Sequence, residues 1–169
     1  MVRRKQILVI GFGKDHCPEL AYRAAYQVGV EVAKHGAVLL TGGLGGVMEA
    51  ASHGAKDSGG FVVGIIPQDD KRTANEFCDV VIATGLGYAR DFVTALSADA
   101  VIVVGGGVGT MIEAAAAYQM YIPIVAVKGT GGFADRYADT FLDDRKVERI
   151  RGESTPEKAV DTAIAAVAT

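Results

Sequence analysis

The sequence predicts an α/β protein with a doubly wound, mostly parallel sheet that helices cover on both faces. Short apolar runs alternate along the chain with longer segments in which apolar residues recur at helical spacing. The runs are apolar at consecutive positions, which is typical of parallel strands buried on both faces. With 169 residues, 50% of them hydrophobic, the chain is expected to form a single domain over residues 1–169.

Each expected strand is a run of largely apolar residues that a glycine or a proline follows within two positions. In chain order these runs predict strands at residues 7–10, 37–40, 61–66, 80–83, 100–104 and 124–127, with an additional edge strand at 147–150.

The expected helices lie between these strands and carry their own start and stop signals. Gly36 ends the first helix, Pro123 breaks the fourth, and Pro156 suits the first position of the last. The segment 68–79 is polar and aperiodic, which predicts an excursion along the surface. In chain order, helices are expected at residues 18–35, 47–56, 88–97, 110–121 and 135–140, and from Pro156 onward.

A glycine-rich turn separates the apolar run 100–104 from a helix that Thr110 is expected to open. Glycines let backbone N–H groups come close to a ligand, and a helix N-terminus adds unpaired donors and the positive end of its dipole. The alternative is that the glycines only pack the helix against the sheet. We expect a phosphate group to bind at Gly106, Gly107, Val108, Gly109 and Thr110.

A second glycine-rich turn, residues 41–46, follows the run 37–40. Ligands of doubly wound sheets bind beyond the carboxyl ends of the strands, so both turns are expected at one site. The loop with Lys14, Asp15 and His16 and the segment 85–90 also follow strands and belong to the same edge. The residues of the second turn expected to bind a nucleotide are Gly42, Gly43, Gly45 and Gly46.

Several classes of function are disfavoured. Neither turn has the Gly-Lys-Ser/Thr ending of a nucleoside triphosphatase, and Thr110 stands where the dinucleotide fingerprint needs glycine. The net charge of −3 and the lack of a long basic run argue against nucleic acid as a partner. The apolar run after Arg3-Arg4-Lys5 is too short for a signal peptide or a membrane span, so we expect a cytoplasmic protein.

The cysteines and histidines indicate neither a disulfide framework nor a metal site. Cys17 and Cys78 lie far apart, and the three histidines are scattered without metal-ligand spacing. Lys128 follows a strand but has no recognisable pyridoxal-phosphate setting, which argues against a Schiff-base enzyme. We therefore expect no metal and no resident cofactor.

Four stretches resemble motifs of the LOG ("lonely guy") family, once labelled lysine decarboxylase-like. Residues 105–113 resemble its Pro-Gly-Gly-x-Gly-Thr-x-x-Glu signature, and Arg90 with Ser97-Ala98-Asp99-Ala100 looks like its arginine helix and the following strand start. Residues 41–48 are similar to its Gly-Gly-Gly-x-x-Gly-Leu-Met turn, and residues 64–67 to its Gly-Ile/Val-x-Pro strand end. The resemblance extends from Ile7 to about Val127.

The resemblance implies a Rossmann-like nucleotide-binding fold. Characterised LOG enzymes are phosphoribohydrolases that cleave the N-glycosidic bond of nucleoside 5′-monophosphates to release the base and ribose 5-phosphate. Three residues depart from the family pattern: Gly105 replaces a proline, Asp91 replaces a lysine, and Glu49 stands where glycine is common. The short chain looks closer to a compact branch that includes molybdenum-cofactor carrier proteins, which bind without hydrolysing.

Two functions are therefore expected from one phosphate-binding site. The first is a nucleoside 5′-monophosphate phosphoribohydrolase, not a lysine decarboxylase; the alternative is a non-catalytic carrier of a nucleotide or a molybdopterin-like molecule. Either way the partner is a small phosphorylated ligand. The apolar helix 114–121, with Tyr118, Met120 and Tyr121 near its end, also predicts a homodimer or larger homo-oligomer.

Arg90 and Glu113 are the expected catalytic residues. N-glycosidic hydrolysis builds positive charge on the ribose, which a carboxylate such as Glu113 would stabilise. Thr110 and Glu113 also fit a capping box, in which Glu113 would serve only the helix. Arg90 is expected to bind the phosphate or the reacting centre, and a surface ion pair with Asp91 or Glu76 is its alternative.

Overall fold

The computed structural model describes residues 3–167 and contains one seven-stranded sheet. Its strands are Gln6–Gly11 (β1), Val38–Thr41 (β2), Phe61–Ile66 (β3), Val80–Ala83 (β4), Ala100–Val104 (β5), Ile124–Val127 (β6) and Arg151–Glu153 (β7). Neighbouring strands are parallel throughout, in the order β4-β3-β2-β1-β5-β6-β7. The order reverses beside β1, because β2 lies on one side of it and β5 on the other.

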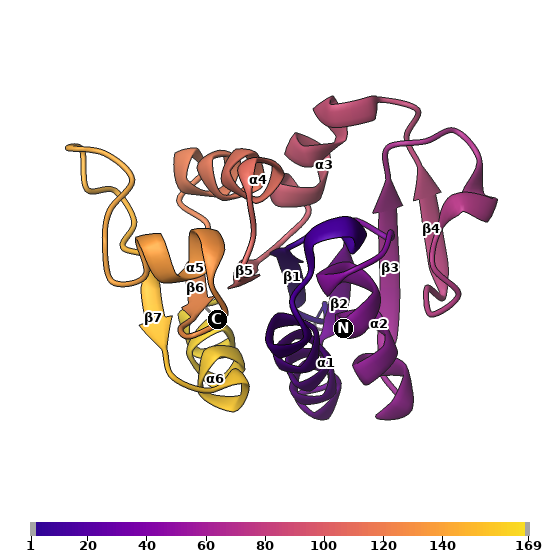
Figure 1. Ribbon diagram of the computed structural model, residues 1–169, viewed down its shortest axis with the longest axis horizontal. Coiled ribbons are helices and arrows are strands. Elements are labelled where there is room, and N and C mark those ends of the chain that lie inside the picture. Colours follow the sequence, from indigo (N-terminus) through magenta and orange to yellow (C-terminus); the bar gives the residue numbers. More distant parts are fainter. Residues whose placement is uncertain (1–2, 168–169) are drawn as a thin grey trace.

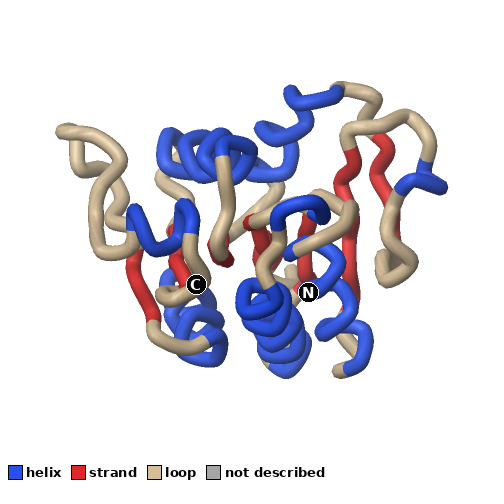
Figure 2. The backbone as a smooth tube through the Cα atoms, viewed as in Figure 1, coloured by secondary structure: helices blue, strands red, loops and turns tan. Residues whose placement is uncertain are grey.

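The described helices lie on both faces of this sheet. They are Glu19–Lys34 (α1), Val47–Asp57 (α2), Arg90–Leu96 (α3), Val108–Gln119 (α4), Gly132–Tyr137 (α5) and Pro156–Ala166 (α6). Figure 1 shows α1, α2 and α6 grouped in the lower half of the molecule, with α3 and α4 above. Figure 2, coloured by secondary structure, shows helices and strands alternating as the chain is followed. The predicted class, a doubly wound Rossmann-like α/β fold, is confirmed.

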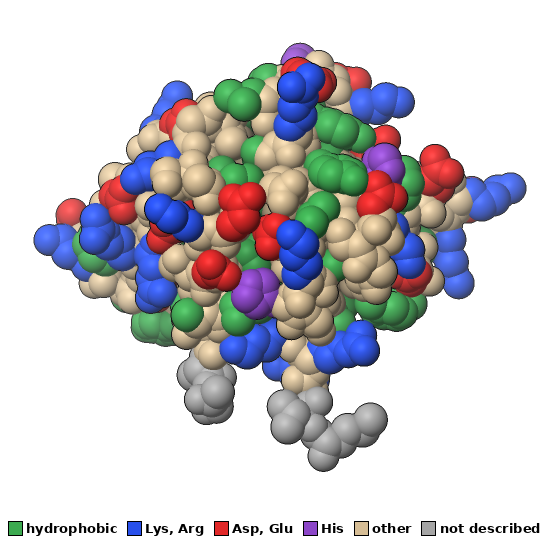
Figure 3. Space-filling view, turned by 90° about the horizontal axis from the view of Figure 1, so that it is seen from below, with side chains coloured by type: hydrophobic (Ala, Val, Ile, Leu, Met, Phe, Trp, Pro, Cys, Tyr) green, Lys and Arg blue, Asp and Glu red, His purple; other side chains and the backbone are tan. Residues whose placement is uncertain are grey.

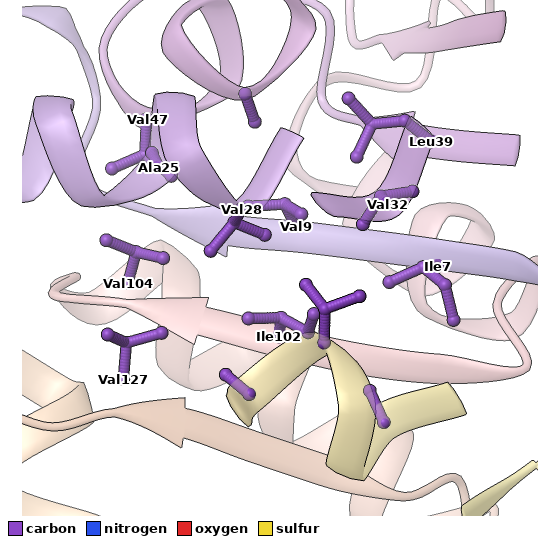
Figure 4. Packing of buried hydrophobic residues seen from close by; sticks show 14 of the residues in the cluster. Ile7, Val9, Ala25, Val28, Val32, Leu39, Val47, Ile102, Val104 and Val127 are labelled. Atoms are coloured by element: carbon purple, nitrogen blue, oxygen red, sulfur yellow. The ribbon is translucent and has the colours of Figure 1, made fainter. Parts of the chain in front are cut away.

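The two faces of the sheet support two separate cores. Ile7 and Val9 of β1 pack with residues of α1, α2 and α6, whereas Leu8 and Ile10 pack with residues of α3, α4 and α5. Figure 4 shows the first of these cores, where side chains of α1 and of β1 point into one layer. Because both faces are buried, β1 has no polar alternation, and the same reason accounts for the apolar run of β5.

Several predicted boundaries are wrong. The edge strand at 147–150 is displaced to β7, because Ile150 is fully buried and bonds to the preceding turn, donating its N–H to the Thr140 carbonyl and accepting from the Asp139 N–H. The helix expected at 135–140 is α5, which ends before Asp139, a residue with φ of 64°. The helix expected at 88–97 is divided into a 3-10 turn, Gly87–Ala89, and α3.

The surface carries charges of both signs. Figure 3 shows acidic and basic side chains interspersed on the face seen from below. Within residues 3–167, none of the helices is both long and apolar enough to cross a membrane.

Candidate functional site

A cavity of about 490 Å³ opens where the strand order reverses, beyond the carboxyl ends of β1, β2 and β5. Of the predicted site residues, the structure brings Arg90, Glu113, Gly42, Gly107, Gly109 and Thr110 to this one cavity. Its other lining residues are Val9, Ile10, Gly11, Phe12, Gly13, His16, Met48, Tyr88 and Asp91.

The α4 start, residues 107–110, presents hydrogen-bond donors beside this cavity, which Gly107, Gly109 and Thr110 line. The helix begins at Val108, so the predicted start at Thr110 is wrong, and the Gly107 carbonyl accepts the N–H of Met111 at 3.0 Å. Within residues 3–167 the amides of Val108, Gly109 and Thr110 have no protein acceptor. Free donors at the positive end of a helix dipole favour an anion.

The glycines of the α4 start are not required by packing. A Cβ added to Gly107 or Gly109 would meet no atom within 4 Å. Gly109 also lies inside a helix, where glycine costs roughly 0.5–1 kcal/mol relative to alanine. The alternative that these two glycines only pack α4 against the sheet is therefore not supported by the structure.

Thr110 and Glu113 do not form the capping box that their spacing allows. Thr110 is the third residue of α4, and its hydroxyl donates to the Gly11 carbonyl at 3.0 Å, which ties α4 to the end of β1. The Glu113 carboxylate instead lies 3.7 Å from Nη1 of Arg90. Glu113 therefore belongs to the wall of the cavity, and its side chain is free of a helix-capping role.

Arg90, Asp91 and Glu113 form a buried charged cluster beside the α4 start. Their residues are 8%, 6% and 8% exposed, and Nη1 of Arg90 lies 3.5 Å from Asp91 Oδ1. The alternative considered for Arg90, a surface ion pair with Asp91 or Glu76, does not hold, because Arg90 is buried and its neighbour Asp91 is buried with it. Within residues 3–167, Nε of Arg90 is buried without a hydrogen-bond partner. A buried unpaired donor is costly, so a ligand acceptor at this position would be favoured.

Burial and the charges within the cluster determine the protonation states of Glu113 and Asp91. Burial and, to a smaller extent, the nearby Asp91 carboxylate raise the pKa of Glu113, the Arg90 guanidinium lowers it, and together they bring this pKa to about 8. Burial also raises the pKa of Asp91, which Arg90 counteracts. At neutral pH Glu113 is consequently a neutral acid that can donate a hydrogen bond or a proton.

Gly42 makes room for Arg90. A Cβ on Gly42 would lie 2.6 Å from Nη1 of Arg90 and 2.5 Å from Sδ of Met48. Gly43 and Gly46 adopt positive φ of 71° and 73°. Gly43 packs against Ile66 and Gly64 of β3, Gly46 packs against the backbone of the turn after β1, and Gly45 lies against Lys14. Of the second glycine turn, the structure therefore brings only Gly42 to the cavity.

Gly105 and its neighbours show why the loop departs from the family pattern. Gly105 has φ of 62° and donates its N–H to the Thr130 hydroxyl at 2.8 Å, so a proline, with fixed negative φ and no N–H, does not fit. Gly106 and Val108 line a smaller neighbouring cavity instead of the main one. The predicted phosphate-binding segment is thus divided between two cavities.

Sequence reasoning missed Phe12, Met48 and the direct role of Asp91 in the wall. Phe12 lies in the turn after β1, and Met48 lies in the first turn of α2 directly after the glycines. Their positions next to glycine-rich turns were the only feature of the sequence that could have indicated that they line the cavity. Lys128 lies outside the cavity lining, with Nζ 3.4 Å from Asp139. Within residues 3–167, no three His, Cys, Asp or Glu side chains are grouped to hold a metal ion.

The fold and the cavity define a Rossmann-like protein whose candidate site lies at the reversal of strand order. Residues 4–160 match the model of the SLOG cluster4 family, and the chain belongs to this family. An uncharacterized protein of Archaeoglobus fulgidus is 43% identical over 159 residues, which are 94% of each chain.

Three solved structures are also similar over nearly their whole length. TM1055, a structural genomics target, has a TM-score of 0.88 and 34% identity, covering 95% of this chain and 99% of that one. The molybdenum cofactor binding protein of Rippkaea orientalis and the molybdenum cofactor carrier protein of Chlamydomonas reinhardtii both have a TM-score of 0.84, at 31% and 33% identity. In each of these two comparisons the match covers 99% of this chain and 100% of the other chain. The resemblance to the LOG superfamily and its compact carrier branch is confirmed.

Proposed function

We propose that this protein binds a small phosphorylated molecule in the main cavity and carries it without chemical change. The observation that carries the proposal is the convergence of two unsatisfied donor sets, the amides of the α4 start and Nε of Arg90. A volume of about 490 Å³ lies within the roughly 300–1,000 Å³ of small-molecule sites. The two similar proteins named for the molybdenum cofactor support a phosphorylated pterin of that class as the cargo.

A second candidate function is nucleoside 5′-monophosphate hydrolysis, which the carboxyl groups of Asp91 and Glu113 favour. Water would add to C1′ of the ribose while the bond from C1′ to the base nitrogen breaks. Glu113, as a neutral acid, would give its proton to the leaving base, and the resulting carboxylate would take the proton that the added water loses. The carboxylate that stabilises positive ribose is then Asp91 rather than Glu113. In this function Arg90 would bind the phosphate.

The two functions are distinguished by one panel of ligands. The protein is incubated with nucleoside monophosphates while ribose 5-phosphate is assayed, and binding of the same ligands and of the phosphorylated pterin is measured by calorimetry. Binding without release of ribose 5-phosphate supports the carrier, and turnover supports the hydrolase. Failure of every phosphorylated ligand to bind would contradict both functions.

Two variants sharpen the comparison. If hydrolysis occurs, Glu113→Gln keeps the size of the side chain but removes its transferable proton, so turnover should fall by about a hundredfold or more with affinity nearly unchanged. Arg90→Ala should weaken ligand binding in both functions, because a phosphate contact acts before and during any reaction. A Glu113→Gln variant with full turnover would remove Glu113 from the mechanism.

A further inference from the structure

A second cavity of about 170 Å³ lies between α4 and α5, on the other side of the α4 start. It is lined by the backbone of Gly106 and Gly107 and by side chains that include Met111, Phe133, Arg136 and Tyr137. The function proposed above makes no use of this cavity. It nevertheless touches the segment to which the phosphate is assigned.

Gly107 lines both cavities. A Cβ at this position would meet nothing within 4 Å, and Gly106 on the same loop also has no side chain. At Gly107, therefore, backbone alone stands between the two cavities. A ligand whose phosphate lies at the α4 start can extend in both directions from it.

The second cavity has the chemistry of a subsite for a flat ring. The ring centroids of Phe133 and Tyr137 lie 4.5 Å apart, and the angle between the ring planes is 32°. The Met111 thioether adds polarizable apolar surface. The exposed guanidinium of Arg136 can stack on such a ring or pair with its acceptors. At about 170 Å³ the space is below the roughly 300 Å³ of complete ligand sites, so it suits one ring system.

We propose that the ligand carries two heterocycles joined through a diphosphate, and that it spans both cavities. The diphosphate lies at Gly107 and the α4 start, the larger part of the ligand fills the main cavity, and the second ring lies against Tyr137 and Arg136. This inference rests on the proposed function, because it uses the same phosphate-binding segment.

The test compares adenosine 5′-monophosphate with P1,P2-di(adenosine 5′) diphosphate by calorimetry on the full chain. The two-ring ligand should bind about tenfold tighter or more, since its second ring gains a subsite without a second loss of translational freedom. Tyr137→Leu and Arg136→Gln should remove most of this gain and leave the affinity for the monophosphate unchanged. Arg72→Gln is the matched control, because Arg72 is exposed and lines neither cavity.

The possible outcomes distinguish failure of the two-cavity inference from failure of the proposed function. Equal affinity for the two ligands would overturn the two-cavity ligand and leave the phosphate site intact. Equal loss of both ligands in Arg136→Gln, in a variant with unchanged melting temperature, would also overturn it. Failure of both ligands to bind the parent protein would overturn this inference, and the proposed function is overturned as well only if the phosphorylated pterin also fails to bind.

Discussion

Gly42 links the fold and the candidate site at the scale of one residue. A methyl group there would press on Nη1 of Arg90 and on Sδ of Met48, and both are ends of flexible side chains. Gly42→Ala should therefore leave the melting temperature nearly unchanged and lower the affinity for phosphorylated ligands by about tenfold, because Arg90 is displaced. In an Arg90→Ala background the same substitution should have little effect. An equal loss in both backgrounds would show that Gly42 acts by another route.

Glu113 should give stability a measurable dependence on pH. Its pKa is about 8 in the folded protein and near its usual 4.5 in the unfolded chain, so between these values the folded state binds the extra proton. Stability contributed by this proton is complete below pH 4.5 and is lost as pH rises through 8, by up to about 1.4 kcal/mol per unit. Melting temperatures at pH 5–8 should fall more steeply for the parent than for Glu113→Gln. Parallel curves would contradict a raised pKa at Glu113.

At the scale of an element, the first turn of α4 contains a glycine that lowers helix stability but leaves the anion site open to a ligand. Gly109 lies within the helix and lines the main cavity, and a Cβ there meets no protein atom. Gly109→Ala should stabilise the fold by roughly 0.5–1 kcal/mol, measured by urea unfolding. The same variant should bind phosphorylated ligands less tightly, because the methyl group enters the anion site. Greater stability with full affinity would place the anion elsewhere.

The sequence predicts most elements of this fold, because β1, β5 and the long helices have strong periodicity. It misplaces elements where contacts distant in sequence decide. Thr110 has the residue type of a helix cap, yet its hydroxyl is used by the Gly11 carbonyl of β1, and the helix begins two residues earlier. β7 is polar at an exposed edge, and its apolar neighbour Ile150 is turned into the core. Neither the Thr110–Gly11 hydrogen bond nor the burial of Ile150 can be inferred from the local sequence.

The candidate site is predictable only in part for the same reason. The two glycine turns are visible in the sequence, but the close approach of Arg90 to Gly42 is a tertiary contact. Asp91 stands out in the sequence only as a departure from a family pattern, whereas burial beside Arg90 and Glu113 gives it a role. Strand order, which brings α3 and α4 to one cavity, is likewise a property of the whole sheet.

For the whole molecule, an apolar face on α3 and α4 favours self-association. Phe92, Leu96 and Met120 are 55%, 52% and 56% exposed around a groove of about 370 Å³. Tyr118, which the sequence suggested for this surface, is instead buried and hydrogen-bonded to Asp143. We expect a homodimer through the α3 and α4 face. Sedimentation at micromolar concentration should show a dimer for the parent and a monomer for Leu96→Glu, and a monomeric parent would refute the expectation.

The central claim is that the α4 start binds the phosphate of the ligand. The most direct measurement is a titration of isotope-labelled protein with adenosine 5′-monophosphate, followed by nuclear magnetic resonance of the backbone amides. We expect the amide resonances of Val108, Gly109 and Thr110 to shift with the nucleotide, not to shift with adenosine, and not to shift in Gly107→Val. Binding that leaves these three resonances unmoved, or that shifts them equally with adenosine, would contradict it.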